Sequence, residues 1–93
     1  MPIEIEHDEP HARFVAPIEG ELAMIEYTRP DARTLDLYRT FVPPAGRGHG
    51  LAALLVRAAL DHAAAEGLRV IPTCSYVAGF IDKHPEYEPL VHA

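Results

Sequence analysis

The residues best suited to chemistry form the segment Gly46-Arg47-Gly48-His49-Gly50. Glycines let a backbone approach an anion closely, because no Cβ stands in the way. Arg47 adds a guanidinium that can contact a phosphate through two N–H groups, and His49 adds a further donor. A helical pattern begins directly afterwards, and the first turn of a helix offers unpaired N–H groups and the positive end of its dipole. The segment therefore predicts a site for a phosphate-bearing ligand.

A plain strand-to-helix loop is the alternative interpretation of these residues, because glycines also relieve steric strain in turns. No Gly-Lys-Ser/Thr follows the glycines, so the loop is not of the Walker type. A dinucleotide-binding fold needs a second strand–helix–strand half, and this chain of 93 residues shows none.

The elements that must position this loop are short strands followed by a helix. Strands are predicted over 13–15, 22–28 and 34–42, with turn residues between them. In the third strand, alternation puts Leu35, Leu37 and Phe41 on one face and Asp36, Tyr38 and Thr40 on the other.

The spacing of apolar residues then changes to that of a helix over 51–66, with an apolar stripe at Leu51, Leu54, Leu55, Ala58 and Ala59. Gly67 is the predicted terminating glycine. A short strand over 68–73 and a second helix over 76–83 follow. This order predicts a single α+β (mixed α/β) domain over 1–93, with an antiparallel meander and one parallel strand–helix–strand crossover.

Composition narrows the function classes. A net charge of -6 argues against non-specific nucleic-acid binding and against an anionic membrane surface. A single cysteine excludes an intrachain disulfide, and no signal peptide is recognisable, so we expect a cytoplasmic protein. Residues 1–10 are expected to form a flexible, solvated acidic segment. The histidines show no metal-ligand spacing, and we assign His7, His11, His62 and His92 to the surface.

Arg47-Gly48-His49-Gly50-Leu51-Ala52 resembles the Q/R-x-x-G-x-G/A motif of the GCN5-related N-acetyltransferases, which holds the pyrophosphate of coenzyme A. From Leu35 onward the chain resembles the minimal acetyltransferase-like members of that family, with Val70 to Val77 and Lys83 to Tyr87 in collinear order. The resemblance implies the acetyltransferase core, acetyl-CoA or CoA as cofactor, and an amine acceptor of unknown identity. Members of the family often carry His where this chain has Arg39.

The resemblance also implies further cofactor-binding residues outside the loop: Phe41, Val42, Tyr76, Lys83 and His84. It places Cys74 near the opening between two diverging parallel strands, where the thioester lies. There Cys74 is either a nucleophile activated by a helix N-terminus or a small buried hydrophobe, and both interpretations stay open.

Tyr76 and Tyr87 are candidates for protonating the departing thiolate, the alternative being packing with the hydroxyl at the surface. His84 is a candidate base, or a cation for phosphate, or a solvated histidine at a helix end. The predicted reaction is transfer of an acetyl group from acetyl-CoA to an amine, with an N–H near Val42 polarising the thioester carbonyl. Two rival functions are a CoA-binding module without robust catalysis and a thioester hydrolase that uses Cys74 with His84.

Overall fold

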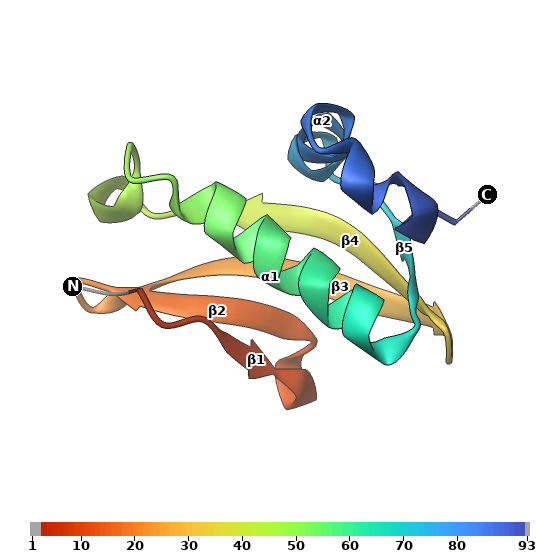
Figure 1. The fold of residues 1–93 in the computed structure, drawn as a ribbon. Coiled ribbons are helices and arrows are strands. Elements are labelled where there is room, and N and C mark those ends of the chain that lie inside the picture. Colours follow the sequence, from red (N-terminus) through yellow and green to blue (C-terminus); the bar gives the residue numbers. More distant parts are fainter. Residues whose placement is uncertain (1–2, 93) are drawn as a thin grey trace.

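The computed structural model describes residues 3–92 and contains one five-stranded sheet in the order β1-β2-β3-β4-β5 (Figure 1). The strands are β1 (Glu6–Asp8), β2 (Arg13–Ile18), β3 (Glu21–Asp31), β4 (Thr34–Phe41) and β5 (Arg69–Ile71). Neighbours in this order are antiparallel except β4 and β5, which are parallel. The mixed sheet confirms the predicted α+β class.

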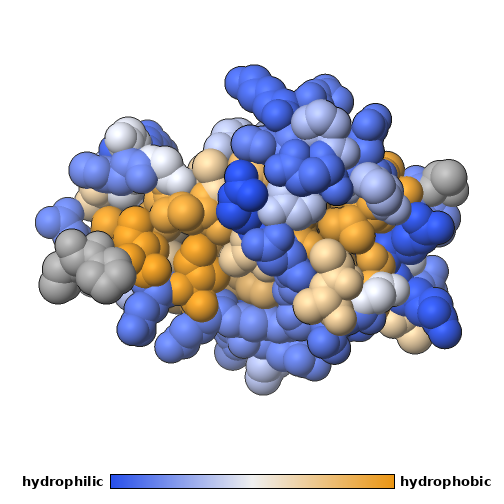
Figure 2. Space-filling model, in the orientation of Figure 1, coloured by the Kyte–Doolittle hydropathy of each residue, from blue (hydrophilic) through white to orange (hydrophobic). Residues whose placement is uncertain are grey.

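Helix α1 (Leu51–Glu66) forms the crossover from β4 to β5 and lies across one face of the sheet, and α2 (Ser75–Lys83) follows β5 (Figure 1). Figure 2 shows this side of the molecule, on which hydrophilic and hydrophobic side chains are both visible. Short 3₁₀ segments are Glu9–His11, Pro44–Gly46 and Pro85–Leu90. Gly67 ends α1 in the left-handed conformation at φ 68°, and its N–H donates to the carbonyls of Ala63 and Ala64. The predicted bounds of α1 and its terminating glycine are confirmed.

The buried stripe of α1 differs from the predicted one. Its buried side chains are Leu51, Leu55, Val56, Ala59, Leu60 and Ala63, whereas Leu54 is 41% exposed. The helix packs against β2, β3 and β4 on one side and against α2 and the Pro85–Leu90 segment on another. The buried face of α1 therefore includes Val56 and Leu60 instead of Leu54. The prediction that Leu54 belongs to the core is wrong.

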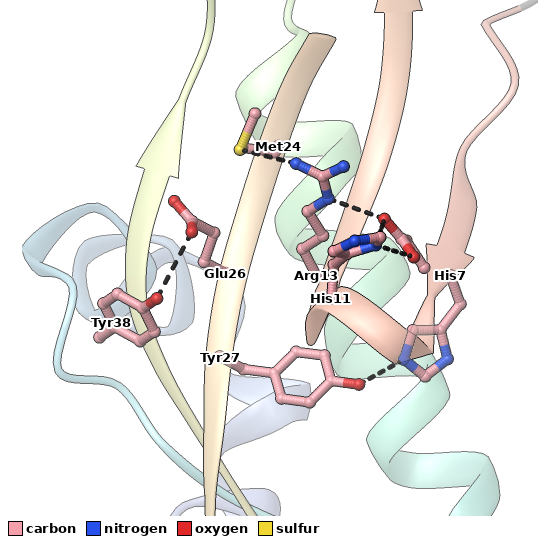
Figure 3. A network of polar contacts seen from close by, with 8 residues as sticks. His7, His11, Arg13, Met24, Glu26, Tyr27 and Tyr38 are labelled. Carbon is pink, nitrogen blue, oxygen red and sulfur yellow. Dashed lines mark hydrogen bonds and ion pairs between the residues drawn. The ribbon is translucent and has the colours of Figure 1, made fainter.

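The N-terminal segment is ordered from Glu6 onward and is not a solvated tail there. Glu6–Asp8 pairs with Arg13–Val15 as an edge strand. The ring of His7 stacks on Phe14 with centroids 4.2 Å apart. The Nε2 of His7 lies 2.7 Å from the Tyr27 hydroxyl oxygen, the contact drawn in Figure 3. The flexible segment predicted for residues 1–10 is therefore wrong from Glu6 onward, and residues 1–2 lie outside the described part of the chain.

His62 is the second histidine that departs from its predicted place at the surface. Its ring centroid is 4.5 Å from that of His7 and 5.5 Å from that of Phe14, so it helps to hold β1 against α1. His11 and His92 are exposed as predicted.

A β-bulge in β4 changes which residues face α1. Tyr27 pairs with Leu37 but Glu26 pairs with Arg39, which leaves Tyr38 as an extra residue in β4. An extra residue reverses the facing of everything beyond it. Thr40 therefore shares the helix-covered face with its partner Ile25, and Phe41 lies on the opposite face. The predicted faces of Thr40 and Phe41 are wrong for this reason.

Candidate functional site

The glycine-rich loop leads from β4 into the first turn of α1. Pro44–Gly46 forms a single 3₁₀ turn, and Gly48 and Gly50 then adopt φ values of 84° and 69°, which glycine tolerates best. Gly50 is the N-cap of α1, and no side chain caps the helix. The first intrahelical bond runs from the Leu54 N–H to the Gly50 carbonyl. The N–H groups of residues 51–53 therefore point out of the helix end without an intrahelical acceptor.

A depression of about 250 Å³ lies at this helix end, lined by Val42, Gly46, Arg47, Gly48, Gly50, Leu51 and Ala52. None of the described acidic side chains lines it. A Cβ built on Gly48 or Gly50 would meet no atom within 4 Å, so the space over both glycines is open. Open space, outward N–H groups and a guanidinium fit the pyrophosphate of coenzyme A.

Gly46 has a different role from the other two glycines. A Cβ on this buried residue would lie 3.1 Å from both Leu51 Cδ2 and Val42 Cγ1. The close contact fixes the loop against the start of α1, so a side chain at position 46 would displace the depression.

The side chains of the loop are exposed. The Nε–H of Arg47 donates to the Val42 carbonyl at 3.2 Å, which folds the guanidinium back toward β4. His49 is exposed and does not line the depression. Phe41 lies on the sheet face opposite α1, with the guanidinium of Arg39 5.6 Å from its ring centroid. Phe41 is thus not brought into the loop site.

The edge of β4 that leads to this loop is unpaired on the β5 side over residues 38–41, and we call this unpaired edge the opening. β5 pairs with residues 34–36 of β4 and ends at Ile71, so within residues 3–92 no strand pairs with residues 38–41 on that side. The chain returns at Cys74, whose N–H donates to the Leu37 carbonyl at 2.9 Å. Cys74 is the N-cap of α2, and its Sγ lies 3.6 Å from Thr40 Oγ1. The bulge in β4 and the end of β5 therefore bring a hydroxyl and a thiol together.

The surroundings of Cys74 favour its thiolate. Partial burial raises the pKa of the thiol, but the Thr40 hydroxyl and the N–H groups of Val77, Tyr76 and Thr40 outweigh burial, and the net pKa is lowered. A lowered pKa makes a larger fraction of the sulfur nucleophilic near neutral pH.

Tyr76 and Lys83 lie along one side of α2, where they line a groove of about 270 Å³ with Ser75, Gly79 and Phe80. Tyr76 is 44% exposed, so its hydroxyl is available to a ligand. The structure therefore brings these two predicted cofactor-binding residues together in a groove of their own.

His84 lies at the other end of α2 from Cys74. The two residues cap a nine-residue helix, so their backbones are about 15 Å apart at 1.5 Å per residue. The His84 ring lies against Phe80 with centroids 4.2 Å apart, and its Nδ1 is 3.9 Å from a carboxylate oxygen of Glu86. A Cys74–His84 dyad is excluded, and the hydrolase hypothesis that depended on it is wrong.

Tyr87 is a packing residue. Its buried hydroxyl donates to Asp61 Oδ1 at 2.7 Å and accepts from Arg57 Nη1 at 3.1 Å. Burial and the Asp61 carboxylate raise the pKa of this hydroxyl. Because the Tyr87 hydroxyl is hydrogen-bonded to two side chains of α1, it is not placed to protonate a thiolate that leaves at the opening.

Thr40 is the site residue that the sequence alone did not indicate. Strict alternation put it on the wrong face, and a bulge has no reliable signal in a single sequence. The Arg-Thr-Phe run at 39–41 carries no charge or glycine pattern that marks Thr40 as functional.

The mixed sheet with its parallel crossover is the fold of an acetyltransferase-type domain, and comparison with known proteins gives its family. Residues 13–90 match the family model described as GCN5-related N-acetyl-transferase. The chain belongs to this family.

Individual relatives agree with the family model. The chain is 38% identical over 86 residues to Protein NATD1 of Bos taurus, covering 90% of this chain and 76% of that protein. It is 36% identical over 93 residues to Protein NATD1 of Gallus gallus, covering 98% and 84%. A GCN5-like protein from Staphylococcus aureus, solved by NMR, shares the fold with a TM-score of 0.68 at 24% identity, over 97% of this chain and 88% of that one.

Membership of the family indicates an acetyltransferase, and the family generally uses acetyl-CoA as donor. Within residues 3–92, no helix is long and apolar enough to cross a membrane.

Proposed function

We propose that this protein transfers an acetyl group from acetyl-CoA to an amine and holds the pyrophosphate of the donor at residues 47–52. One observation carries the proposal: the N-terminus of α1 opens, without a side-chain cap, into a depression that has a guanidinium and no carboxylate. Negative charge at such a helix end is stabilised by the outward N–H groups and the helix dipole.

Each part of the site has a role in this proposal. The N–H groups of residues 51–53 and the Arg47 guanidinium bind the pyrophosphate. Tyr76 and Lys83 bind the donor along α2. Bound acetyl-CoA supplies an activated thioester, which we place at the opening beside residues 38–42 of β4. Backbone N–H groups there polarise the thioester carbonyl, the interaction that contributes most in acyl transfer.

The Thr40–Cys74 pair allows a two-step transfer in which the acetyl group is first bound to Cys74. The Cys74 thiolate attacks the acetyl carbon, the bond from that carbon to the donor sulfur breaks, and the electron pair leaves with that sulfur. A neutral amine then attacks the same carbon, and the bond from that carbon to the Cys74 sulfur breaks. The electron pair returns to the Cys74 sulfur, and the amine loses one proton to solvent. Thr40 holds the Cys74 sulfur at the opening by its hydroxyl. The alternative route is direct attack by a neutral amine, and Cys74 then packs beside the thioester.

Calorimetric titration tests the donor site. Acetyl-CoA and CoA should bind, and Arg47→Ala should weaken both by a charge-assisted contact of about 1.5–3 kcal/mol. Gly50→Val should weaken binding because its branched side chain enters the open space over the glycine. Normal binding of CoA by folded Gly50→Val protein would refute the assignment of the loop.

Intact-mass measurement tests the role of Cys74. Incubation with acetyl-CoA and no amine should leave one acetyl group on the protein, removable by hydroxylamine and absent from Cys74→Ser. Thr40→Val keeps the shape of Thr40 but removes its hydroxyl and should slow acetylation of Cys74, whereas Thr40→Ser should restore it. An absent adduct, with near-normal turnover of folded Cys74→Ala protein, would remove Cys74 from the mechanism and leave the direct route.

A CoA-binding module with little catalysis is the second candidate. Two observations favour it: the side chain that contacts the Cys74 sulfur is a threonine, and His84 is too far from Cys74 to act as its base. Binding of CoA without turnover of any amine in a varied panel would select this candidate. A cytoplasmic location and the absence of nucleic-acid and membrane partners stay predictions from composition.

A further inference from the structure

The sheet face opposite α1 carries a row of alternating charges. Asp8 pairs in register with Arg13, Arg13 with Glu26, and Glu26 with Arg39, so the four residues lie side by side across β1, β2, β3 and β4. Figure 3 shows Arg13 and Glu26 on this part of the sheet. Their side chains are 22%, 25%, 21% and 55% exposed in that order. Neither described helix covers this charged row, because α1 and α2 pack together in the core on the other face.

An apolar row runs beside the charged row. Val15 pairs with Met24, and Met24 pairs with Phe41, on the same face as Arg13 and Glu26. Val15 is buried, and Met24 and Phe41 are half-buried. Met24 and Phe41 therefore give this face apolar contact area next to charges, the combination found at protein–protein interfaces, whereas Val15 supports them from below.

The order of the charges is self-complementary. Across the strands it reads minus, plus, minus, plus, and the same row reversed reads plus, minus, plus, minus. A two-fold axis parallel to the strands would lay a second copy on this face with the row reversed. Asp8 would then lie opposite Arg39 of the second copy, and Arg13 opposite Glu26. Aligned packing of two sheets face to face is a standard arrangement.

We infer that this face is an isologous interface at which the protein binds a second copy of itself. In such an interface the same patch is used on both copies, and a self-complementary patch is what it requires. The inference is independent of the proposed reaction, since the loop at 47–52 does not belong to either row.

The size of the patch sets the strength of the dimer. β2, β3 and β4 contribute about 20 Å of strand length each and the three-residue β1 about 10 Å, so a spacing of about 4.8 Å gives a footprint of about 340 Å². Stable interfaces use about 800 Å² per partner, so the dimer should be weak and should form only at high protein concentration. Charge pairing at a rim is also screened by salt.

Analytical ultracentrifugation of the wild-type protein is the first test. The weight-average mass should rise toward that of a dimer as protein approaches about 1 mM at low salt, and it should fall back at about 300 mM salt. A mass that stays that of a monomer at about 1 mM and low salt would overturn the inference.

Two charge reversals then test the geometry. Arg13→Glu and Glu26→Arg each place like charges opposite one another at two points of the homodimer, so each variant alone should be monomeric. Mixed in equal amounts, they complement one another at all four points and should form a heterodimer. Variants that each self-associate as the wild type does, or a mixture that stays monomeric while both are folded by circular dichroism, would refute the arrangement.

A milder pair of variants covers the case in which a reversal prevents folding. Arg39→Ala removes the most exposed charge of the row and should weaken association. Arg33→Ala removes the same charge from the β3–β4 turn, outside the face, and should leave association unchanged. Equal association of these two variants would contradict the proposed interface.

Discussion

Gly50 and Gly67 provide a matched pair for testing the phosphate site, because they flank the same helix in nearly the same conformation. Gly50 precedes α1 at φ 69° and ψ 18°, and Gly67 follows it at φ 68° and ψ 28°. A Cβ at either position would meet no atom within 4 Å. An alanine therefore adds the same methyl group and the same backbone strain at both ends of α1, and only one end faces the predicted ligand.

The cost to stability should be the same for both variants. A left-handed conformation costs a residue with a Cβ about 1–2 kcal/mol relative to glycine. For a domain of this size, 1 kcal/mol corresponds to a change in melting temperature of about 4–8 °C. Gly50→Ala and Gly67→Ala should thus melt below the wild type by similar amounts and should still be folded at room temperature.

The effect on binding should differ between them. The methyl group of Gly50→Ala projects into the space where the pyrophosphate would contact the N–H groups of residues 51–53. Loss of about 1.4 kcal/mol would weaken CoA binding tenfold, and we expect at least that loss for Gly50→Ala by calorimetry. Gly67→Ala should bind CoA as the wild type does.

Two results would refute this reasoning. Equal CoA affinity in the two variants would mean that the space over Gly50 is not the pyrophosphate site. A much larger loss of stability in Gly50→Ala than in Gly67→Ala would mean that the strain at the two ends of α1 is not equivalent, and binding data for Gly50→Ala could then not be interpreted.

Three further predictions concern residues outside the loop. Tyr87→Phe should lower stability by about 1.5 kcal/mol in thermal melts, through lost bonds to Asp61 and Arg57, and turnover at saturating donor should not change. The free energy of unfolding should fall as the pH drops below about 6.5. Burial, and after it the charge of His62, lower the pKa of His7 in the folded protein, so protonation of His7 favours the unfolded chain. His7→Phe should flatten that part of the pH profile. Gly79→Ala should raise stability by about 0.5–1 kcal/mol, because Gly79 lies within α2 and its added Cβ meets no neighbour.

The helix and the glycine-rich loop before it were predictable from sequence as structural elements because their signals are local. Ala and Leu favour a helix over 51–66, and glycines mark both of its ends. The depression at 42–52 follows directly from this, since a glycine N-cap leaves the first-turn N–H groups open. Only the face of α1 was misjudged at Leu54, because the second surface against which α1 packs comes from residues more than twenty positions later in the chain.

The opening around Cys74 and the N-terminal strand depend on contacts between distant residues, and local signals did not reveal them. Glu6–Asp8 is too short and too acidic to be recognised as a strand, and it is held by the packing of His7 on Phe14 and His62. Cys74 was correctly placed after the last strand, but its neighbour Thr40 is separated from it by 34 positions. Their contact depends on the register of β4 against β3.

The bulge at Tyr38 links the candidate site to the proposed interface. Without the extra residue, alternation from Leu37 would place Arg39 on the face covered by α1, where burial of an unpaired guanidinium is costly. With it, Arg39 pairs with Glu26 and completes the charged row, while Thr40 turns toward Cys74. The same irregularity therefore positions the hydroxyl beside the thiol and the fourth charge on the opposite face. A substitution that shifts the bulge should impair both the acetylation of Cys74 and self-association. A change at Thr40 alone should impair only the acetylation, and a change at Arg39 alone only self-association.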